Sequence, residues 1–278
     1  MTEFTTLLSD LVLVESPRWH DDRLVFSDWG AGEVIAVDLD GKHEVITTVD
    51  AMPFCLDRLP DGRLLVVAGD QLLIRAPDQG LSTYAELGGI STKPWNDIVI
   101  DGRGNTYVNN IGFDFPDEEF APGLITLVHP DGSVRQVAEG LAFPNGMAVT
   151  PDNSTLIVAE SYGGALTAYD IGPDGELSGR RVWANLDGAA PDGICMDAEG
   201  AVWFAEVPGR RCVRVAEGGG VLQTLVSDLG CFACALGGPD KATLFVTAAA
   251  WPDAMTPGSR TGQILMARVE VPAAGWPA

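Results

Sequence analysis

Short runs of alternating apolar and polar residues recur along the chain, and each follows a turn signal of the Asp-Gly or Pro-Asp type. Alternation bounded by such turns predicts short antiparallel strands. The six runs, spaced about 40 to 50 residues apart, are HDDRLVFSD at 20, PDGRLLVVA at 60, DGRGNTYVNN at 101, PDNSTLIVAE at 151, DAEGAVWFAE at 197 and PDKATLFVT at 239. The repeating unit is therefore a small antiparallel sheet.

Six small sheets at this period predict an all-β fold, a six-bladed β-propeller with a central metal site, because each blade can bury its faces against its neighbours. Amphipathic helical windows of ten or more residues are nearly absent. The run FTTLLSDLVLV before the first unit is expected to supply the outer strand of the last blade. Residues 1–278 are expected to form one propeller domain, since a lipocalin-like barrel or a sandwich would not explain the sixfold spacing.

The segment before each turn is expected to be the innermost strand of its blade, with its first residues at one mouth of a central channel. Counting back five to seven residues from each turn gives one residue per blade: Glu15, Cys55, Asn96, Asn145, Asp192 and Ala233. Two carboxylates and two amides on one axis are oxygen donors that suit one divalent cation, first Ca²⁺ and alternatively Mg²⁺, Mn²⁺ or Zn²⁺. Each residue alone would be an ordinary turn or surface residue, but their common register favours a metal site.

The charge of the chain restricts its partners. With 17 Lys and Arg against 39 Asp and Glu, the formal net charge is −22, which argues against nucleic acid or an anionic membrane surface. The N-terminal segment lacks the pattern of a signal peptide, and no apolar stretch approaches the roughly 18 residues of a membrane span, so a cytoplasmic location is expected. The expected partner is a small-molecule substrate, and the chain is expected to be a monomer or a weak homo-oligomer.

The five cysteines, an odd number, indicate reduced thiols rather than a disulfide framework. Cys231 and Cys234 form one C-x-x-C pair. Zinc needs four ligands, and no second Cys pair or His cluster stands at zinc-like spacing, so this pair is expected to be buried and structural.

Several motifs together resemble the senescence-marker protein/gluconolactonase (regucalcin-like) family of six-bladed propellers. They cover almost the whole chain and include ESPRW at 15–19, NDIVIDGRGNTYV at 96–108, FPNGMAVTPD at 143–152 and PDGICMDAEGAVWFA at 191–205. The resemblance implies a divalent cation held by Glu15, Asn145 and Asp192, with Asn96 as a further ligand or a substrate contact. It also implies hydrolysis of the ester bond in a small lactone.

One position departs from the family pattern. The sugar-lactonase members carry an arginine two residues before the asparagine of the ND motif, where it contacts the polyhydroxylated substrate, whereas this chain has Pro94 followed by Trp95. The change disfavours sugar lactones and favours a less polar substrate. Lys93 is expected to point to the other side if the strand alternates.

The predicted activity is that of a metal-dependent lactonase. A bound cation can polarise the lactone carbonyl and lower the pKa of a water molecule. Asp192 is the expected catalytic base, deprotonating that water or, alternatively, attacking the carbonyl. No G-x-S-x-G motif is present, and the three histidines lie outside the register of the site.

Loops at the same mouth are expected to form the substrate pocket. The predicted substrate contacts are Asn96, Trp95, Tyr162, Asn110, Phe113 and Glu160. Segment 111–123 is the longest irregular stretch and could be a lid or a solvated surface loop. Two alternatives stay open: a metal-dependent propeller of another reaction type, phosphotriesterase-like or condensing, and a non-catalytic binding propeller.

Overall fold

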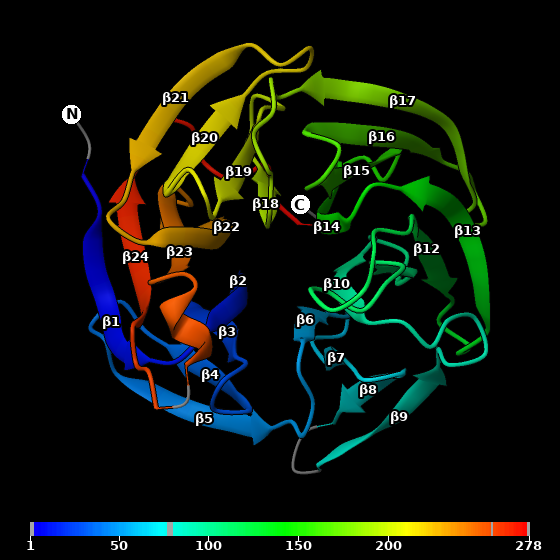
Figure 1. The fold of residues 1–278 in the computed structure, drawn as a ribbon, viewed down its shortest axis with the longest axis horizontal. Coiled ribbons are helices and arrows are strands. Elements are labelled where there is room, and N and C mark those ends of the chain that lie inside the picture. The colour runs from blue at the N-terminus through cyan, green and yellow to red at the C-terminus, as the bar shows by residue number, and fades with distance from the viewer. Residues whose placement is uncertain (1–2, 77–79, 257, 277–278) are drawn as a thin grey trace.

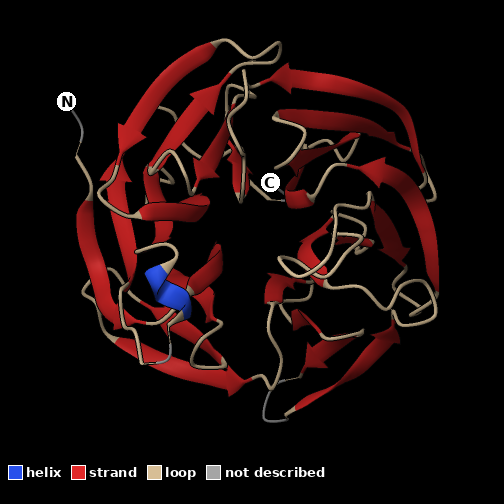
Figure 2. Cartoon of the chain, viewed as in Figure 1, coloured by secondary structure: helices blue, strands red, loops and turns tan. Residues whose placement is uncertain are grey.

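The structure is a computed structural model that describes residues 3–76, 80–256 and 258–276. Within these ranges, six four-stranded antiparallel sheets surround a central axis (Figure 1). One short 3-10 helix, η1 (Asp253–Met255), is the only helical element of the described residues (Figure 2). The predicted all-β six-bladed propeller is confirmed.

Each blade is numbered here in chain order, from its inner to its outer strand. Blade 1 contains β2 (Val14–His20), β3 (Arg23–Asp28), β4 (Glu33–Val37) and β5 (His43–Thr48), and blade 2 contains β6 (Phe54–Arg58), β7 (Leu64–Ala68), β8 (Gln71–Arg75) and β9 (Leu81–Glu86). Blade 3 contains β10 (Trp95–Ile100), β11 (Thr106–Asn110), β12 (Gly123–Val128) and β13 (Val134–Leu141), and blade 4 contains β14 (Pro144–Val149), β15 (Thr155–Glu160), β16 (Ala165–Ile171) and β17 (Leu177–Asn185). Blade 5 contains β18 (Ile194–Met196), β19 (Val202–Glu206), β20 (Arg211–Val215) and β21 (Val221–Val226), and blade 6 contains β22 (Gly230–Gly237), β23 (Thr243–Ala249), β24 (Gly262–Arg268) and β1 (Thr5–Leu11).

The apolar core lies between neighbouring blades. Every residue of β10 and β11 is buried, whereas the outer strands β5 and β21 are largely exposed. Leu65 of blade 2 and Ile98 of blade 3, for example, belong to one buried cluster. Because a blade packs on both faces, its central strands are almost continuously apolar and its outer strand alternates, which explains the run pattern of the sequence.

The ring closes through the N-terminal strand. β1 pairs antiparallel with β24, with Thr5 opposite Met266 and Leu11 opposite Gly262. The prediction that FTTLLSDLVLV completes the last blade is thus confirmed. No helix among the described residues is long and apolar enough to span a membrane.

The inner strands β2, β6, β10, β14, β18 and β22 line the axis (Figure 1). We call the end at which they begin the first mouth and the opposite end the far mouth. Adjacent inner strands approach closely at two motif glycines: an added Cβ on Gly193 would lie 2.2 Å from Ala233 Cβ, and one on Gly146 would lie 2.5 Å from the Ile194 nitrogen. The glycines of PNG and PDG therefore allow neighbouring blades to meet at the axis.

Candidate functional site

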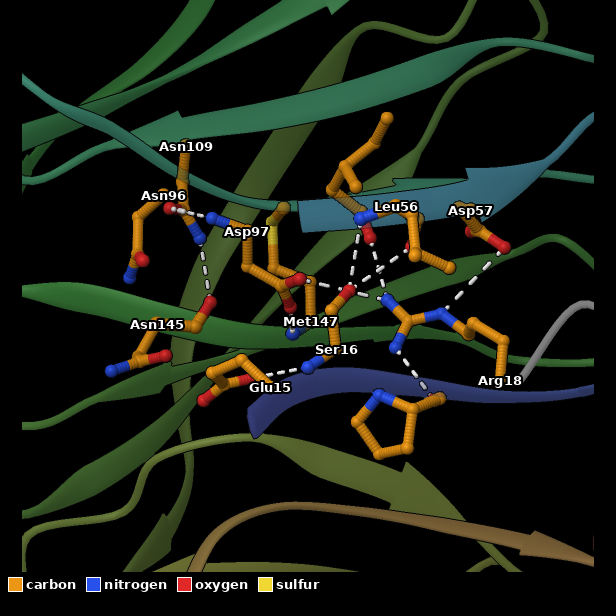
Figure 3. Close-up of polar contacts among 12 residues, drawn as sticks. Glu15, Ser16, Arg18, Leu56, Asp57, Asn96, Asp97, Asn109, Asn145 and Met147 are labelled. Carbon is orange, nitrogen blue, oxygen red and sulfur yellow. Dashed lines mark hydrogen bonds and ion pairs between the residues drawn. The ribbon is translucent and has the colours of Figure 1, made fainter. Parts of the chain in front are cut away.

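Residues from all six inner strands meet around a small cavity at the first mouth. Its lining includes Glu15, Cys55, Asn96, Asn145 and Ala233, and blade 5 contributes Gly193 beside Asp192. The volume, about 10 Å³, is enough for one ion or one water molecule. Figure 3 shows Glu15, Asn96 and Asn145 gathered on one side of the view. The cavity thus brings together five of the six predicted register residues; Asp192 is outside its lining, but its carboxylate hydrogen-bonds with Asn145. We call the four register residues with oxygen donors, Glu15, Asn96, Asn145 and Asp192, the oxygen ring.

Among the described residues, neither carboxylate of the oxygen ring forms an ion pair, although the Arg18 charge partly offsets that of Glu15. Burial raises the pKa of Glu15 to about 8, although its carboxylate accepts a hydrogen bond from the Ser16 N–H. Burial also raises the pKa of Asp192 well above its usual value, the nearby Glu15 carboxylate adds to the shift, and hydrogen bonding from Asn145 opposes it. Both shifts express the cost of negative charge in a poorly solvated place.

The donor set of the oxygen ring fits a hard divalent cation. Its four candidate ligands, Glu15, Asn96, Asn145 and Asp192, offer only oxygen donors of the kind that Ca²⁺, Mg²⁺ and Mn²⁺ prefer. Nowhere in the described ranges do three or more His, Cys, Asp or Glu side chains form a metal-ligating group. The two amides are therefore essential members of this set, and a cation here would offset the repulsion between the two acids.

A layer of buried charges lies directly beside the oxygen ring and was missed by the sequence analysis. Arg18 places Nε 3.6 Å from Asp57 Oδ1 and Nη2 3.5 Å from Asp97 Oδ1 (Figure 3). Its Nη2 also donates to the Ile98 carbonyl at 2.8 Å. Arg18 is thus already shared between two carboxylates. The sequence did contain a signal for this layer. In three inner strands a charged residue, Arg18, Asp57 or Asp97, follows the register residue by one to three positions.

Burial raises the pKa of both Asp57 and Asp97, and the Arg18 charge opposes each shift. Backbone donors also hold these two carboxylates in place. The Ile100 N–H donates to Asp57 Oδ2 at 2.9 Å, and the Met147 N–H donates to Asp97 Oδ2 at 3.0 Å. The charged layer therefore cross-links the inner strands of blades 1 to 4.

Hydrogen bonds between blades fix the amides of the oxygen ring. Asn109 accepts from the Asp97 N–H at 3.0 Å and donates Nδ2 to the Asn145 carbonyl at 2.6 Å (Figure 3). Asn145 Nδ2 donates to Ser161 Oγ at 3.3 Å, and Ser161 Oγ donates to the Pro191 carbonyl at 2.7 Å. Blades 3, 4 and 5 are thereby held together next to Asp192, which favours a preorganised site.

Two of the predicted substrate contacts belong to a group of five aromatic rings beside the oxygen ring. We call Phe113, Phe115, Phe120, Phe143 and Tyr162 the aromatic cluster; neighbouring centroids are 4.9 to 6.4 Å apart. Phe113 is buried, whereas Phe115, Phe120 and Tyr162 are 44%, 51% and 55% exposed. The aromatic cluster thus presents three partly exposed rings side by side.

The loop that carries three of these rings is anchored and close to the oxygen ring. Lys93 Nζ lies 2.9 Å from Asp114 Oδ2 and 2.5 Å from Glu118 Oε2, so this side chain tethers the loop after β11. Phe143 stands two residues before Asn145 and has a positive φ of 60°, an uncommon conformation for a bulky residue. One member of the aromatic cluster, Phe143, therefore lies directly before the inner strand that carries the candidate ligand Asn145.

Of the other four predicted substrate contacts, Asn96 lies in the oxygen ring and the remaining three contact protein groups. Trp95 is 2% exposed and packs between blades 2 and 3. Asn110 Nδ2 donates to the Lys93 carbonyl at 2.6 Å, and its Oδ1 accepts from the Gly112 N–H at 3.0 Å. Glu160 accepts from the Ala142 N–H at 2.6 Å and pairs with Arg180 at 3.1 Å. These contacts give the three side chains roles in packing and loop geometry.

The Cys231 and Cys234 pair lies in a larger group of thiols. Cys195, Cys212, Cys231 and Cys234 share one buried cluster between blades 5 and 6, and all are free. Cys195 Sγ lies 3.7 Å from Cys234 Sγ. Cys195 and Cys212 were not predicted to join this pair, because a contact between strands of two blades leaves no short spacing in the sequence.

A six-bladed propeller with oxygen donors converging at one mouth defines the class of this protein. The chain belongs to the SMP-30/gluconolactonase/LRE-like family, whose model matches residues 13–250. Pentonolactonase XacC of Haloferax volcanii is 30% identical over 248 residues, covering 85% of this chain and 81% of the relative. Regucalcin of Xenopus laevis is 28% identical over 248 residues, covering 84% and 82%.

A solved structure supports the fold. The calcium-binding protein regucalcin of Agrobacterium tumefaciens superimposes with a TM-score of 0.82 at 22% identity, covering 96% of this chain and 94% of that chain. The resemblance inferred from the motifs is confirmed by the family match.

Proposed function

We propose that the protein is a divalent-cation-dependent hydrolase of small lactones or related esters. The observation that carries the proposal is the oxygen ring: Glu15, Asn96 and Asn145 line an ion-sized cavity, and the Asp192 carboxylate hydrogen-bonds with Asn145 beside it. Membership of the family and the relative named pentonolactonase support the reaction class.

Calcium is the cation we propose for the oxygen ring. The donor set contains oxygen only, Ca²⁺ accepts carboxylate, amide and water oxygens in a flexible shell, and a solved relative is described as calcium-binding. Mg²⁺, Mn²⁺ and Zn²⁺ are the alternatives to be tested. When bound, the cation supplies Lewis-acid polarisation of the substrate carbonyl and lowers the pKa of a water molecule.

Asp192 is the residue we propose as general base. Residue 192 is partly exposed, whereas Glu15 is 6% exposed and its carboxylate accepts a hydrogen bond from the Ser16 N–H. The Asp192 carboxylate accepts the proton of the attacking water, the acyl carbon–oxygen bond of the lactone breaks, and that proton passes to the departing oxygen. The product is a hydroxy acid, which releases one proton near neutral pH. Asn96 and Asn145 orient the reacting groups.

The substrate we propose is a lactone with an apolar substituent. The aromatic cluster supports this, because three of its rings are about half exposed. Phe143 stands two positions before Asn145 in the sequence, and Tyr162 directly follows Ser161, whose side chain accepts a hydrogen bond from Asn145. Position 94 holds a proline and not a basic residue, which agrees with a less polar substrate.

The test is proton release with a pH indicator in weak buffer, using glucono-δ-lactone, γ-butyrolactone and γ-phenyl-γ-butyrolactone. We expect hydrolysis that EDTA abolishes and one divalent cation restores, with the phenyl-substituted lactone preferred. If the cation-loaded protein hydrolyses none of a wider set of lactones and esters, the proposed reaction is wrong. Hydrolysis that prefers glucono-δ-lactone would overturn the substrate assignment alone.

A further inference from the structure

A second cavity, of about 380 Å³, occupies the far mouth of the channel. Residues at the ends of the inner strands line it, together with the segment after β24. Its volume lies within the range of small-molecule sites. Arg18, Ile194 and Cys234 line both this cavity and the small cavity at the oxygen ring, so these three residues lie between the two. The far-mouth cavity is therefore separate from the proposed catalytic site.

The far-mouth cavity reverses the charge balance of the molecule. The chain carries 39 acidic against 17 basic residues, yet this lining includes Arg18, Arg58 and Lys241 against one acid, Asp57. Asp57 is already engaged by Arg18 and by the Ile100 N–H. Because Arg18 is itself shared between Asp57 and Asp97, Arg58 and Lys241 are the cations that would favour an anionic ligand here.

Two of these cations have capacity for a ligand. Within the described part of the chain, Arg58 Nη1 lies 3.5 Å from the exposed Asp21 carboxylate and 3.4 Å from the Gly62 carbonyl, both long contacts, and Arg58 Nη2 donates to no protein group. No ion pair of the described residues involves Lys241. A guanidinium or ammonium N–H without a protein partner can donate to a bound acceptor.

The segment after β24 completes one wall of the cavity. The Ala198 N–H donates to the Pro272 carbonyl at 2.8 Å, and the Ala273 N–H donates to the Lys241 carbonyl at 2.8 Å. These bonds hold residues 272 and 273 against blades 5 and 6, and the half-exposed Trp276 of the same segment lies in the lining. Met147 and Ile194 supply further apolar wall.

We propose that the far-mouth cavity binds a small organic carboxylate with an aromatic or compact apolar body. Arg58 and Lys241 hold the carboxylate, since guanidinium and ammonium groups form charge-assisted hydrogen bonds with it. The apolar body packs against Met147, Ile194 and the Trp276 indole. The inference is independent of the proposed hydrolysis, because its site lies at the other end of the channel.

The test is calorimetric titration of the calcium-loaded protein with benzoate, phenylacetate and 3-phenylpropanoate, with benzamide as the neutral comparison. We expect at least one acid to bind with a stoichiometry of one, and benzamide to bind about tenfold more weakly or worse. Lys241→Ala and Arg58→Gln should each weaken the acid by about tenfold, and Lys241→Arg should retain binding. The matched control is Lys42→Ala, an exposed lysine outside the cavity lining, which should bind as the wild type does.

Three results would overturn the proposal. The first is that none of the three acids binds. The second is that binding is equal in the wild type, Lys241→Ala and Arg58→Gln, with unfolding midpoints showing that all three are folded. The third is that binding disappears in Glu15→Gln and persists in Lys241→Ala, which would place the acid at the oxygen ring.

Discussion

Replacing Arg18 by methionine tests the buried charged layer. The substitution keeps most of the apolar stem and removes a guanidinium that faces Asp57 at 3.6 Å and Asp97 at 3.5 Å. It also removes the hydrogen bond to the Ile98 carbonyl. Both carboxylates keep their backbone donors, so their positions need not change.

The expected loss can be bounded. Removing one partner of a buried ion pair costs about 3 to 5 kcal/mol. The cost has a ceiling because a carboxylate can take up a proton, and holding one aspartic acid protonated at pH 7 costs about 4 kcal/mol relative to its ordinary pKa. We therefore expect the free energy of unfolding to fall by about 3 to 5 kcal/mol, which a protein of ordinary stability survives. The double variant Arg18→Met/Asp57→Asn should recover about 1 kcal/mol or more.

The assay is urea unfolding followed by tryptophan fluorescence, with Arg63→Met as the matched control. Arg63 pairs with Asp61 on the surface, where both side chains are about half exposed, so its loss should change stability by less than about 1 kcal/mol. A loss below about 1 kcal/mol for Arg18→Met, or no recovery in the double variant, would refute the account of this layer.

Three further predictions concern catalysis, specificity and packing. Asp192→Asn should stay folded and lose turnover by about 10²- to 10⁴-fold in the proton-release assay, whereas the exposed Asp187→Asn should not; equal rates would remove Asp192 from the mechanism. Phe120→Ala should lower kcat/KM for γ-phenyl-γ-butyrolactone by about 2- to 10-fold and leave γ-butyrolactone unchanged, and an equal effect on both lactones would contradict a role for this ring in specificity. Gly193→Ala should lower the free energy of unfolding by about 1 to 3 kcal/mol, because the new Cβ would lie 2.2 Å from Ala233 Cβ, while Gly89→Ala, with open space around it, should be nearly neutral.

The repeat and the register could be predicted because both depend on local signals. Turn residues and alternation mark each strand, so the sixfold period and the outer strand from FTTLLSDLVLV follow from the sequence, and β1 confirms the latter. Counting from each turn also placed Glu15, Asn96 and Asn145 around one cavity, since each inner strand runs from the first mouth to a turn at the far mouth.

Contacts across blades could not be predicted in the same way. Whether Trp95 faces the channel or the neighbouring blade depends on the twist and bulges of its strand, and β10 has a register shift between Trp95 and Ile98. The pairing of Glu160 with Arg180 and the approach of Cys195 to Cys234 join residues whose separation in sequence carries no pattern. Side-chain partners of this kind are fixed by packing.

The most direct test of the oxygen ring is calorimetric titration of Ca²⁺ into chelator-treated protein. We expect one ion per chain in the wild type, at least about 100-fold weaker binding in Glu15→Gln, and wild-type binding in the exposed control Glu217→Gln. Binding that is unchanged in Glu15→Gln would contradict the account. So would the absence of binding for Ca²⁺, Mg²⁺, Mn²⁺ and Zn²⁺ alike.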